Sequence, residues 1–235
     1  MIDKAIVLAG GFGTRLQAVV QDVPKPMALI NGRPFLDYQL NYLKSFGINH
    51  IIFSVGYKHE HISDFFGKEY NGMTIEYAVE KEPLGTGGGI QNAFQFIKSG
   101  VALVVNGDTL FEVNLKNFYE KHQKNAAIIS LALRQIEDVS RYGIVETNTK
   151  QRIIGFAEKG AKIGQGFING GVYLIEKDFF EQNSFKQKFS MEKDAFEKYY
   201  NEQNFFGFPY QSYFLDIGIP EDYKKAQDEF KKLGY

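Results

Sequence analysis

The stretch AIVLAGGFGTRL, residues 5–16, sets the pattern for the whole chain. Its first four residues form a short apolar run that is typical of a buried strand. Gly10, Gly11 and Gly13 follow, and glycine lets the backbone take positive φ and bring its N–H groups against a ligand. Arg15 can then donate two parallel hydrogen bonds to a phosphate.

A lysine held between two prolines follows this stretch, in Pro24-Lys25-Pro26-Met27. The strand, the glycine turn, the arginine and this lysine, whose backbone the prolines restrict, together predict a site for a polyphosphate. A plain tight turn is the alternative. The spacing fits neither of two common phosphate loops. No Lys-Ser or Lys-Thr pair follows the glycines, and Leu16 stands where the dinucleotide pattern needs its third glycine.

Outward from this stretch, apolar runs and helical spacings alternate along the chain. Strands are predicted at His50–Val55, Met73–Val79, 101–105 and 126–133, and helices at 34–46, 58–66, 90–97 and 115–122. On the helix at 58–66, Ile62, Phe65 and Phe66 are expected to face inward. This order predicts an α/β protein with a mostly parallel sheet, right-handed crossovers and a ligand site at the carboxyl edge of the strands.

Two further features fall at that edge. Gly85 and the glycines at 87–89 stand just before a predicted helix, whose free N–H groups would attract anions. Asp108 follows a buried strand, where a carboxylate is costly unless it pairs with a cation. Asp108 is therefore a candidate metal ligand, with capping of the next turn as the alternative, and Asp216 within the apolar FLDIG is a second. Two carboxylates suit Mg²⁺.

The second half of the chain has a different pattern, of short strands joined by turns between residues 141 and 175. Ser190 is expected to cap a helix at 189–200, and Pro220 to begin the last helix. In the first turn of the helix at 189–200, Glu192 and Lys193 could reach a sugar, but an ordinary solvated first turn is the favoured interpretation. The pair Glu158-Lys159 would, on the residues alone, be an ordinary solvated pair. His59 and His61 do not share a helix face, so we expect them to be solvated rather than metal ligands.

The bulk composition limits the function. With 235 residues, one α/β domain is expected, and the net charge of −1 argues against binding to nucleic acid or to an anionic membrane by bulk charge. The absence of cysteine excludes disulfides and thiolate chemistry and is compatible with a cytoplasmic location. The apolar N-terminal run is too short for a signal peptide, and no window approaches the roughly 20 apolar residues of a membrane helix.

GGFGTRL together with PKPM resembles the sugar-phosphate nucleotidyltransferases, also called nucleotide-sugar pyrophosphorylases, from Ile2 to about Phe230. The resemblance implies a Rossmann-like sheet with flanking helices and a small β-rich sugar-binding part in one domain, with a nucleotide half at 1–125 and a sugar-phosphate half at 126–235. It implies that a sugar 1-phosphate attacks a nucleoside triphosphate with Mg²⁺ as cofactor. Arg15 and Lys25 would be catalytic, and Asp108 and Asp216 would hold the metal.

The resemblance also implies the binding residues. Those for the nucleotide would be Leu8, Ala9, Gly10, Gly11, Gly13, Thr14, Glu80, Gly85, Thr86 and Asp108, of which Glu80, Gly85 and Thr86 would surround the base. Those for the sugar phosphate would be Gly107, Tyr142, Gly143, Glu158, Lys159, Asn169 and Gly170.

Within that family, EPLGTGGGI, FINGGVYLI, FSMEKDAF and FLDIGIPEDY most resemble the D-glycero-D-manno-heptose 1-phosphate guanylyltransferases. GTP and the heptose 1-phosphate would then be the substrates, for bacterial surface polysaccharide. A uridylyl- or cytidylyltransferase on mannose, N-acetylmuramic acid or another sugar 1-phosphate stays open, and so do a monomer and a small homo-oligomer. No β-helix or acyltransferase extension follows, so we expect a monofunctional enzyme. A nucleotide-sugar sensor would be expected to lose Arg15, Lys25 or a metal aspartate, and all of these are present.

Overall fold

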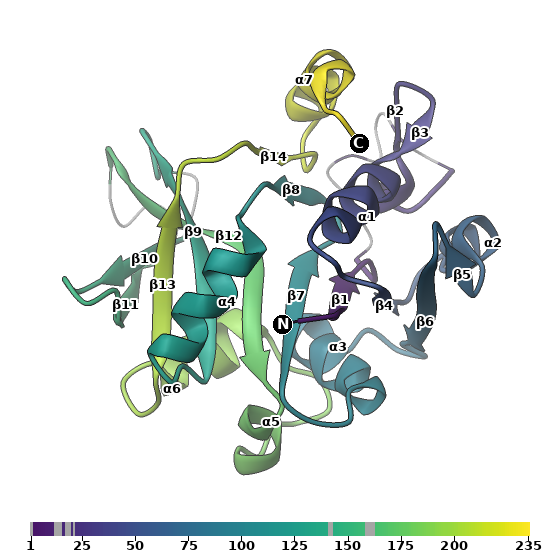
Figure 1. Cartoon of the computed structure of the whole chain (residues 1–235). Helices are drawn as coiled ribbons and strands as arrows, with labels where there is room; N and C mark the ends of the chain where they lie inside the picture. The colour runs from purple at the N-terminus through teal and green to yellow at the C-terminus, as the bar shows by residue number, and fades with distance from the viewer. Residues whose placement is uncertain (1, 12–15, 17–19, 21, 141–142, 158–162) are drawn as a thin grey trace.

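The computed structural model describes residues 2–11, 16, 20, 22–140, 143–157 and 163–235. Within these residues, ten strands form one sheet, with the order β11-β10-β12-β7-β1-β4-β6-β5 and with β9 and β13 attached through β12 (Figure 1). Its centre is parallel, as predicted: β7 (Val101–Asn106), β1 (Lys4–Leu8), β4 (His50–Val55) and β6 (Met73–Val79).

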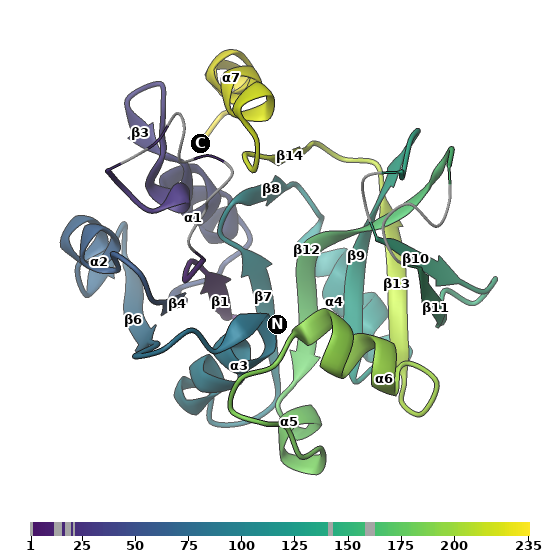
Figure 2. The ribbon, with the colours of Figure 1, turned by 180° about the vertical axis from the view of Figure 1, so that it is seen from behind.

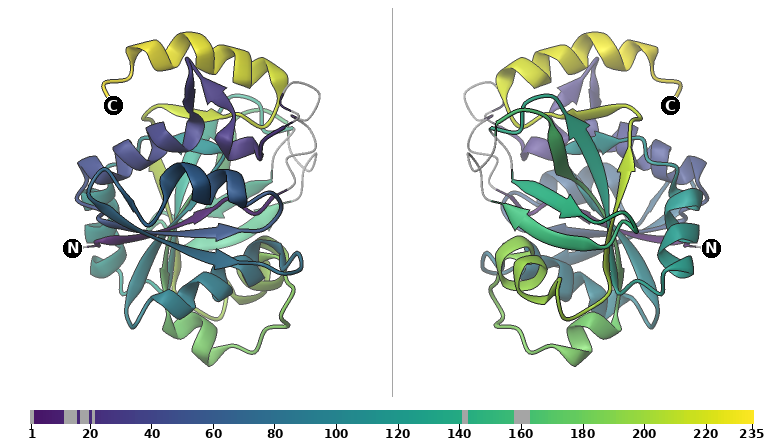
Figure 3. Two further views of the ribbon diagram at one scale, coloured as in Figure 1. Left: turned by 90° about the vertical axis from the view of Figure 1, so that its right-hand side faces the viewer. Right: turned by 90° about the vertical axis from the view of Figure 1, so that its left-hand side faces the viewer.

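Helices cover both faces of the sheet, because successive residues of each buried strand point to opposite sides. Val7 packs into one apolar layer and Ile6 into the other, and β4 and β7 alternate in the same way. Figure 3 shows the sheet edge-on between the two layers. The first layer contains α1 (Phe35–Ser45), α2 (Glu60–Phe66), α4 (Leu115–Lys124) and α7 (Pro220–Glu229); the second contains α3 (Gly85–Ala93), α5 (Asp178–Gln182) and α6 (Glu197–Tyr199).

The second half of the chain extends the same sheet instead of forming a separate one (Figure 2). The long strand β12 (Gly166–Glu176) pairs antiparallel with β7 on one side and with β9 (Ile129–Ile136) on the other. The remaining members are β10 (Ile144–Thr147), β11 (Ile153–Ala157), β13 (Phe205–Tyr210) and β5 (Glu69–Tyr70). The expected β-rich part is therefore continuous with the nucleotide half.

Two short strand pairs lie outside the main sheet. β2 (Leu29–Ile30) pairs with β3 (Arg33–Pro34), and β14 (Phe214–Asp216) pairs antiparallel with β8 (Thr109–Phe111). In the second pair, Asp216 stands opposite Thr109, the neighbour of Asp108. The pairing thus brings together two carboxylates that are far apart in the sequence.

Most predicted elements are confirmed, and the differences have physical causes. Gly47 ends α1 at φ +84°, and Pro220 is the first residue of α7. Phe65, expected to face inward, is 45% exposed, because Ile62 and Phe66 form the buried side of the short helix α2. The predicted strand at 126–133 begins three residues later, after Ala126 takes φ +46°.

Two helices also differ from expectation. α3 begins at Gly85, so the predicted loop glycines are helical. The predicted helix at 189–200 is a π-helical segment, Met191–Phe196, followed by α6, and Ser190 caps it by accepting a hydrogen bond from the Lys193 N–H. Among the described residues, no helix is long and apolar enough to cross a lipid bilayer.

Candidate functional site

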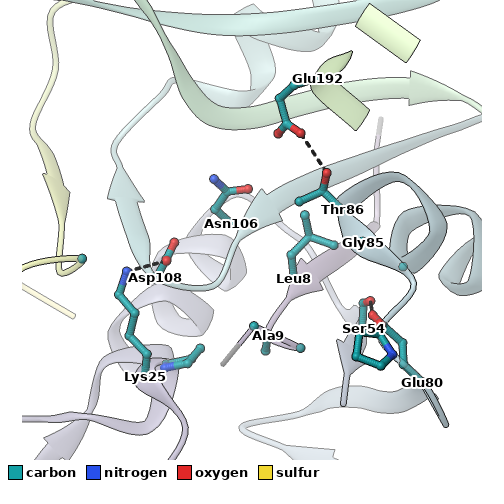
Figure 4. A pocket seen from close by; sticks show the side chains of 16 residues that line it. Leu8, Ala9, Lys25, Ser54, Glu80, Gly85, Thr86, Asn106, Asp108 and Glu192 are labelled. Atoms are coloured by element: carbon teal, nitrogen blue, oxygen red, sulfur yellow. Dashed lines mark hydrogen bonds and ion pairs between the residues drawn. The ribbon is translucent and has the colours of Figure 1, made fainter. Parts of the chain in front are cut away.

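A cavity of about 450 Å³ lies where the parallel strands end (Figure 4). β1, β4, β6 and β7 all contribute residues at or just beyond their carboxyl ends, the edge at which open α/β sheets bind ligands. The sequence-predicted residues that line it are Leu8, Ala9, Gly10, Gly11, Lys25, Glu80, Gly85, Thr86 and Asp108. The lining residues that sequence reasoning did not assign are Pro26, Ser54, Pro83, Gly89, Asn106, Glu192 and Gly218.

Lys25 lies between the two predicted metal aspartates. Its Nζ is 2.6 Å from Asp108 Oδ2 and 3.4 Å from Asp216 Oδ1, and its side chain is only 7% exposed. A single 3₁₀ turn, Lys25–Met27, fixes the backbone between the prolines. Burial and then the charge of Asp108 raise the pKa of Asp216, and Lys25 opposes both effects. The structure therefore brings these three residues together, and their roles as metal ligands and catalytic lysine stay predictions.

The two carboxylates fit a divalent cation. Both hold oxygens within 3.4 Å of one ammonium nitrogen, so the protein already places a positive charge between them. In the described part of the chain, no three His, Cys, Asp or Glu side chains converge on one metal position. Mg²⁺ commonly takes one or two carboxylates and completes its shell with water and phosphate oxygens, which matches this donor set.

The loop that carries Asp108 is fixed by two features of the backbone and one buried side chain. Gln39, 2% exposed on α1, donates from Nε2 to the carbonyls of Asn106, at 2.8 Å, and Thr109, at 2.7 Å. The Gly107 N–H donates to the Leu8 carbonyl, and a Cβ at residue 107 would lie only 2.7 Å from that oxygen. Gly107 thus packs β1 against the loop that carries Asp108, and Gln39 holds the same loop through its two carbonyl contacts.

The glycines of α3 have a different role from the one predicted. The N–H groups of Gly87 and Gly88 donate to the Phe189 carbonyl at 3.1 and 3.4 Å, so these two groups are capped by the protein. A Cβ at Gly87 would collide with the Phe189 ring, and one at Gly88 with the Gln187 carbonyl. These two N–H groups are therefore not available to an anion, and for Gly85 and Thr86 the predicted ligand contact stays a prediction. The missing Cβ atoms let a later segment pack on the start of the helix.

Glu80 lines the cavity, but its carboxylate is engaged within the protein. Oε2 accepts from the Leu84 N–H at 3.0 Å, and Oε1 accepts from the Ser54 hydroxyl at 3.2 Å. Gly10 and Gly89 both approach this carboxylate so closely that a Cβ would crowd it. Glu80 therefore joins β4, the glycine turn after β1 and the start of α3.

A second cavity of about 560 Å³ is formed mainly by the second half of the chain, and Glu192 lines both cavities. Of the predicted sugar-side residues, Gly143 and Asn169 line the second cavity. The Asn169 amide donates to the Tyr173 hydroxyl at 2.9 Å and accepts from the Gly171 N–H. Gly170 is buried against the Phe111 ring, where a Cβ would clash. Gly107 and Gly170 are thus packing residues rather than cavity walls.

Several predicted residues lie outside the described ranges, and their predicted roles stay predictions. They are Gly13, Thr14, Arg15, Tyr142, Glu158 and Lys159.

A glycine turn at the carboxyl edge of a parallel sheet, beside a lysine held by two aspartates, defines a class of α/β proteins that handle nucleotide phosphates. The family model described as "Nucleotidyl transferase" matches residues 4–232, and the chain belongs to this family. This confirms the resemblance read from GGFGTRL and PKPM.

Individual relatives are similar over nearly the whole chain. A D-glycero-alpha-D-manno-heptose 1-phosphate guanylyltransferase of Aneurinibacillus thermoaerophilus is 47% identical, over 97% of this chain and 98% of that protein. A protein of the same name from Campylobacter jejuni is 44% identical, over 94% of this chain and 96% of that protein. The crystal structure of HddC from Yersinia pseudotuberculosis complexed with GMP-PN has a TM-score of 0.86 at 38% identity, covering 97% of this chain and all of that one.

Proposed function

We propose that the chain transfers a guanylyl group from GTP to D-glycero-α-D-manno-heptose 1-phosphate, giving the GDP-heptose and pyrophosphate. The observation that carries the proposal is Lys25 between Asp108 and Asp216 at the mouth of the cavity, in a chain of this family. The choice of GTP and heptose is supported by the names of the two relatives that match almost end to end.

In the proposed reaction, a phosphate oxygen of the sugar 1-phosphate attacks the α-phosphorus of GTP. The bond from that phosphorus to the oxygen bridging the α- and β-phosphates breaks, and its electron pair leaves with pyrophosphate. No protein nucleophile is required, so rate enhancement comes from positioning and charge neutralisation. Lys25 supplies a positive charge beside the reacting phosphates, and Arg15 is proposed to hold the β- and γ-phosphates.

Asp108 and Asp216 would hold Mg²⁺, which when bound offsets the negative charge that gathers on the phosphates. The glycine turn after β1 would receive the nucleotide, and the second cavity would receive the sugar, with Tyr142, Glu158 and Lys159 on that side. The residues 1–125 and 126–235 would thus be the nucleotide and sugar-phosphate halves of one domain. We propose that the enzyme works in the cytoplasm as a monomer or small homo-oligomer and feeds surface polysaccharide synthesis.

The test is pyrophosphate release with Mg²⁺, measured for GTP, UTP, CTP and ATP, each against heptose, mannose and N-acetylmuramic acid 1-phosphates. Release with GTP and the heptose is the expected result. Release with another pair would correct the specificity and keep the reaction. No release with any pair, together with tight binding of a nucleotide sugar, would replace the enzyme by a nucleotide-sugar sensor.

A further inference from the structure

Glu192 stands where the two cavities meet. It belongs to the π-helical segment Met191–Phe196 and lines both the cavity at the strand ends and the second cavity. Figure 4 shows its carboxylate pointing toward Thr86. A carboxylate at this junction can contact a ligand that extends from the first cavity into the second.

Two hydroxyl groups hold this carboxylate by the same oxygen. Thr86 Oγ1 donates to Glu192 Oε2 at 2.8 Å, and Ser190 Oγ donates to it at 2.9 Å. From the described residues, Oε1 accepts no hydrogen bond. An ionised carboxylate is an acceptor at both oxygens, so Oε1 is available for the hydroxyl of a ligand.

The Thr86 hydroxyl also accepts a hydrogen bond from the same segment. It accepts the Met191 N–H at 2.9 Å, while its single proton is used by Glu192. A threonine hydroxyl has one proton, so Thr86 cannot at the same time donate to a base. The contact of Gly87 and Gly88 with the Phe189 carbonyl keeps helix and segment in place around this pair.

We propose that the Thr86 hydroxyl is a positioning group for the sugar 1-phosphate and does not donate to the base: it aligns Glu192 so that Oε1 accepts a sugar hydroxyl. This inference rests on the proposed function, because it assigns the second cavity to the sugar. It gives the Thr86 hydroxyl a role on the sugar side, beside the nucleotide role that the family resemblance implies for this residue.

The test compares Thr86→Val, which keeps the shape and removes the hydroxyl, with Thr86→Ser, which keeps the hydroxyl. For Thr86→Val we expect the KM for the sugar 1-phosphate to rise about tenfold, the size of losing one hydrogen bond to a charged group, with the KM for GTP within about twofold of wild type. Thr86→Ser should restore the sugar KM. Equal rises in both KM values, or an unchanged sugar KM, would overturn the proposal.

A double-mutant cycle tests whether Thr86 acts through Glu192. Glu192→Gln should itself raise the sugar KM, and adding Thr86→Val to it should cause little further change, since residues that act through one contact are not additive. If the double variant instead raises the sugar KM by the product of the two single increases, the proposal is overturned. Titrations with GDP and with the GDP-sugar give the same comparison without turnover: Thr86→Val should weaken only the second ligand.

These outcomes are distinct from a failure of the proposed function. Wild-type protein that releases no pyrophosphate with any sugar 1-phosphate contradicts the enzyme assignment. Wild-type protein that turns over normally, while Thr86→Val leaves sugar binding unchanged, contradicts only the role of Thr86. A melting temperature for each variant shows whether loss of the Met191 contact has disturbed the fold.

Discussion

Lys25 is a buried cation between two carboxylates. We therefore expect its substitution to affect activity and stability more than any other single change at the site. The ammonium is within 2.6 Å of one aspartate oxygen and 3.4 Å of the other, so removal leaves two facing negative charges in a part-buried place. Breaking a buried ion pair by removing one partner is more costly than losing a surface pair. Function and stability are therefore linked at this residue.

Lys25→Met keeps the length of the side chain and removes its charge. We expect kcat to fall about 100-fold or more, since one preorganised charge at the reacting centre has about that effect. Turnover and thermal melting should be measured together, with Lys225→Met as the control, because Lys225 is a half-exposed surface lysine whose Nζ lies 3.6 Å from Glu229 Oε1. Wild-type kcat in Lys25→Met would exclude Lys25 from catalysis.

Asp108→Asn tests the metal assignment at the other side of this contact. The amide keeps the shape and the Thr109 contact but loses the negative charge that a divalent cation needs. We expect Mn²⁺ binding, titrated with a non-hydrolysable GTP analogue present, to weaken at least about tenfold and turnover to be lost. Asp228→Asn, at a side chain 80% exposed on α7, is the matched control. Unchanged Mn²⁺ affinity would remove Asp108 from the metal site.

At the scale of elements, local sequence patterns predicted the helices and strands that depend on local interactions. The strands His50–Val55 and Met73–Val79 follow directly from apolar runs, and the carboxyl-edge site follows from their parallel order. The role of the α3 glycines could not be predicted, because their partner Phe189 is about a hundred residues away in sequence. The sequence shows that glycines cluster there but not which segment fills the space.

Of two further site residues, Gln39 was missed, and Glu192 was considered as a sugar contact but assigned to a solvated first turn. Gln39 stands on the apolar side of α1 between buried leucines, and a polar residue in that stripe was the available signal for a buried hydrogen-bonding role. Glu192 lies in the first turn after the Ser190 cap, where an acidic residue is ordinary. Its place at the junction of two cavities depends on the π-helical segment, which no local pattern indicated.

His122 joins α4 to two strands and makes the stability of this region depend on pH. It is 1% exposed, with Nδ1 2.8 Å from Ser130 Oγ on β9 and Nε2 3.2 Å from Glu176 Oε1 on β12. We assign the neutral ring, with Nε2–H donating to Glu176 and Nδ1 accepting from Ser130. Burial lowers the pKa of His122 from its ordinary 6.5, and Glu176 opposes that shift.

The sign of the pH effect follows from the direction of that shift. The unfolded chain takes up a proton on His122 near pH 6.5, whereas the folded chain takes it up only at lower pH. The contribution of His122 is therefore present above about pH 6.5 and is lost as the pH falls toward the folded pKa. We expect the melting temperature of wild type to fall more steeply between pH 7 and pH 5 than that of His122→Gln. Parallel curves would show that His122 does not titrate differently on unfolding.

At the scale of the whole molecule, the net charge of −1 means that the proposed polyanionic substrates would have to be held by a few fixed cations. Bulk charge gives no general attraction for phosphate, so under the proposed function local positive charge has to supply it, from Lys25 and from the Mg²⁺ that Asp108 and Asp216 would hold. This arrangement depends on both halves of the chain, since Lys25 and Asp108 come from the first and Asp216 and Glu192 from the second. A site built in this way requires that the halves keep a fixed relation.

The sheet provides that relation, and it predicts how the protein unfolds. β12 pairs with β7 from Val172–Val105 to Glu176–Val101, and one apolar layer joins Ile6 and Val104 to Leu131 and Phe205. Separating the halves would break this strand pair and expose residues of both apolar layers, to which the two halves contribute together. We therefore expect one cooperative unfolding transition in urea.

Two probes that report on different halves test this expectation. Far-UV circular dichroism should give the same midpoint as hydrogen exchange of peptides from β4 in the first half and from β13 in the second, because coincident transitions mark two-state unfolding. Gly170→Val gives a sharper version, since a side chain there would clash with the Phe111 ring and force β12 of the second half away from β8 of the first. We expect it to lower the stability measured in both halves equally. Loss of protection in β13 while β4 stays protected would show instead that residues 1–125 and 126–235 unfold separately, and that the site is assembled from two independent parts.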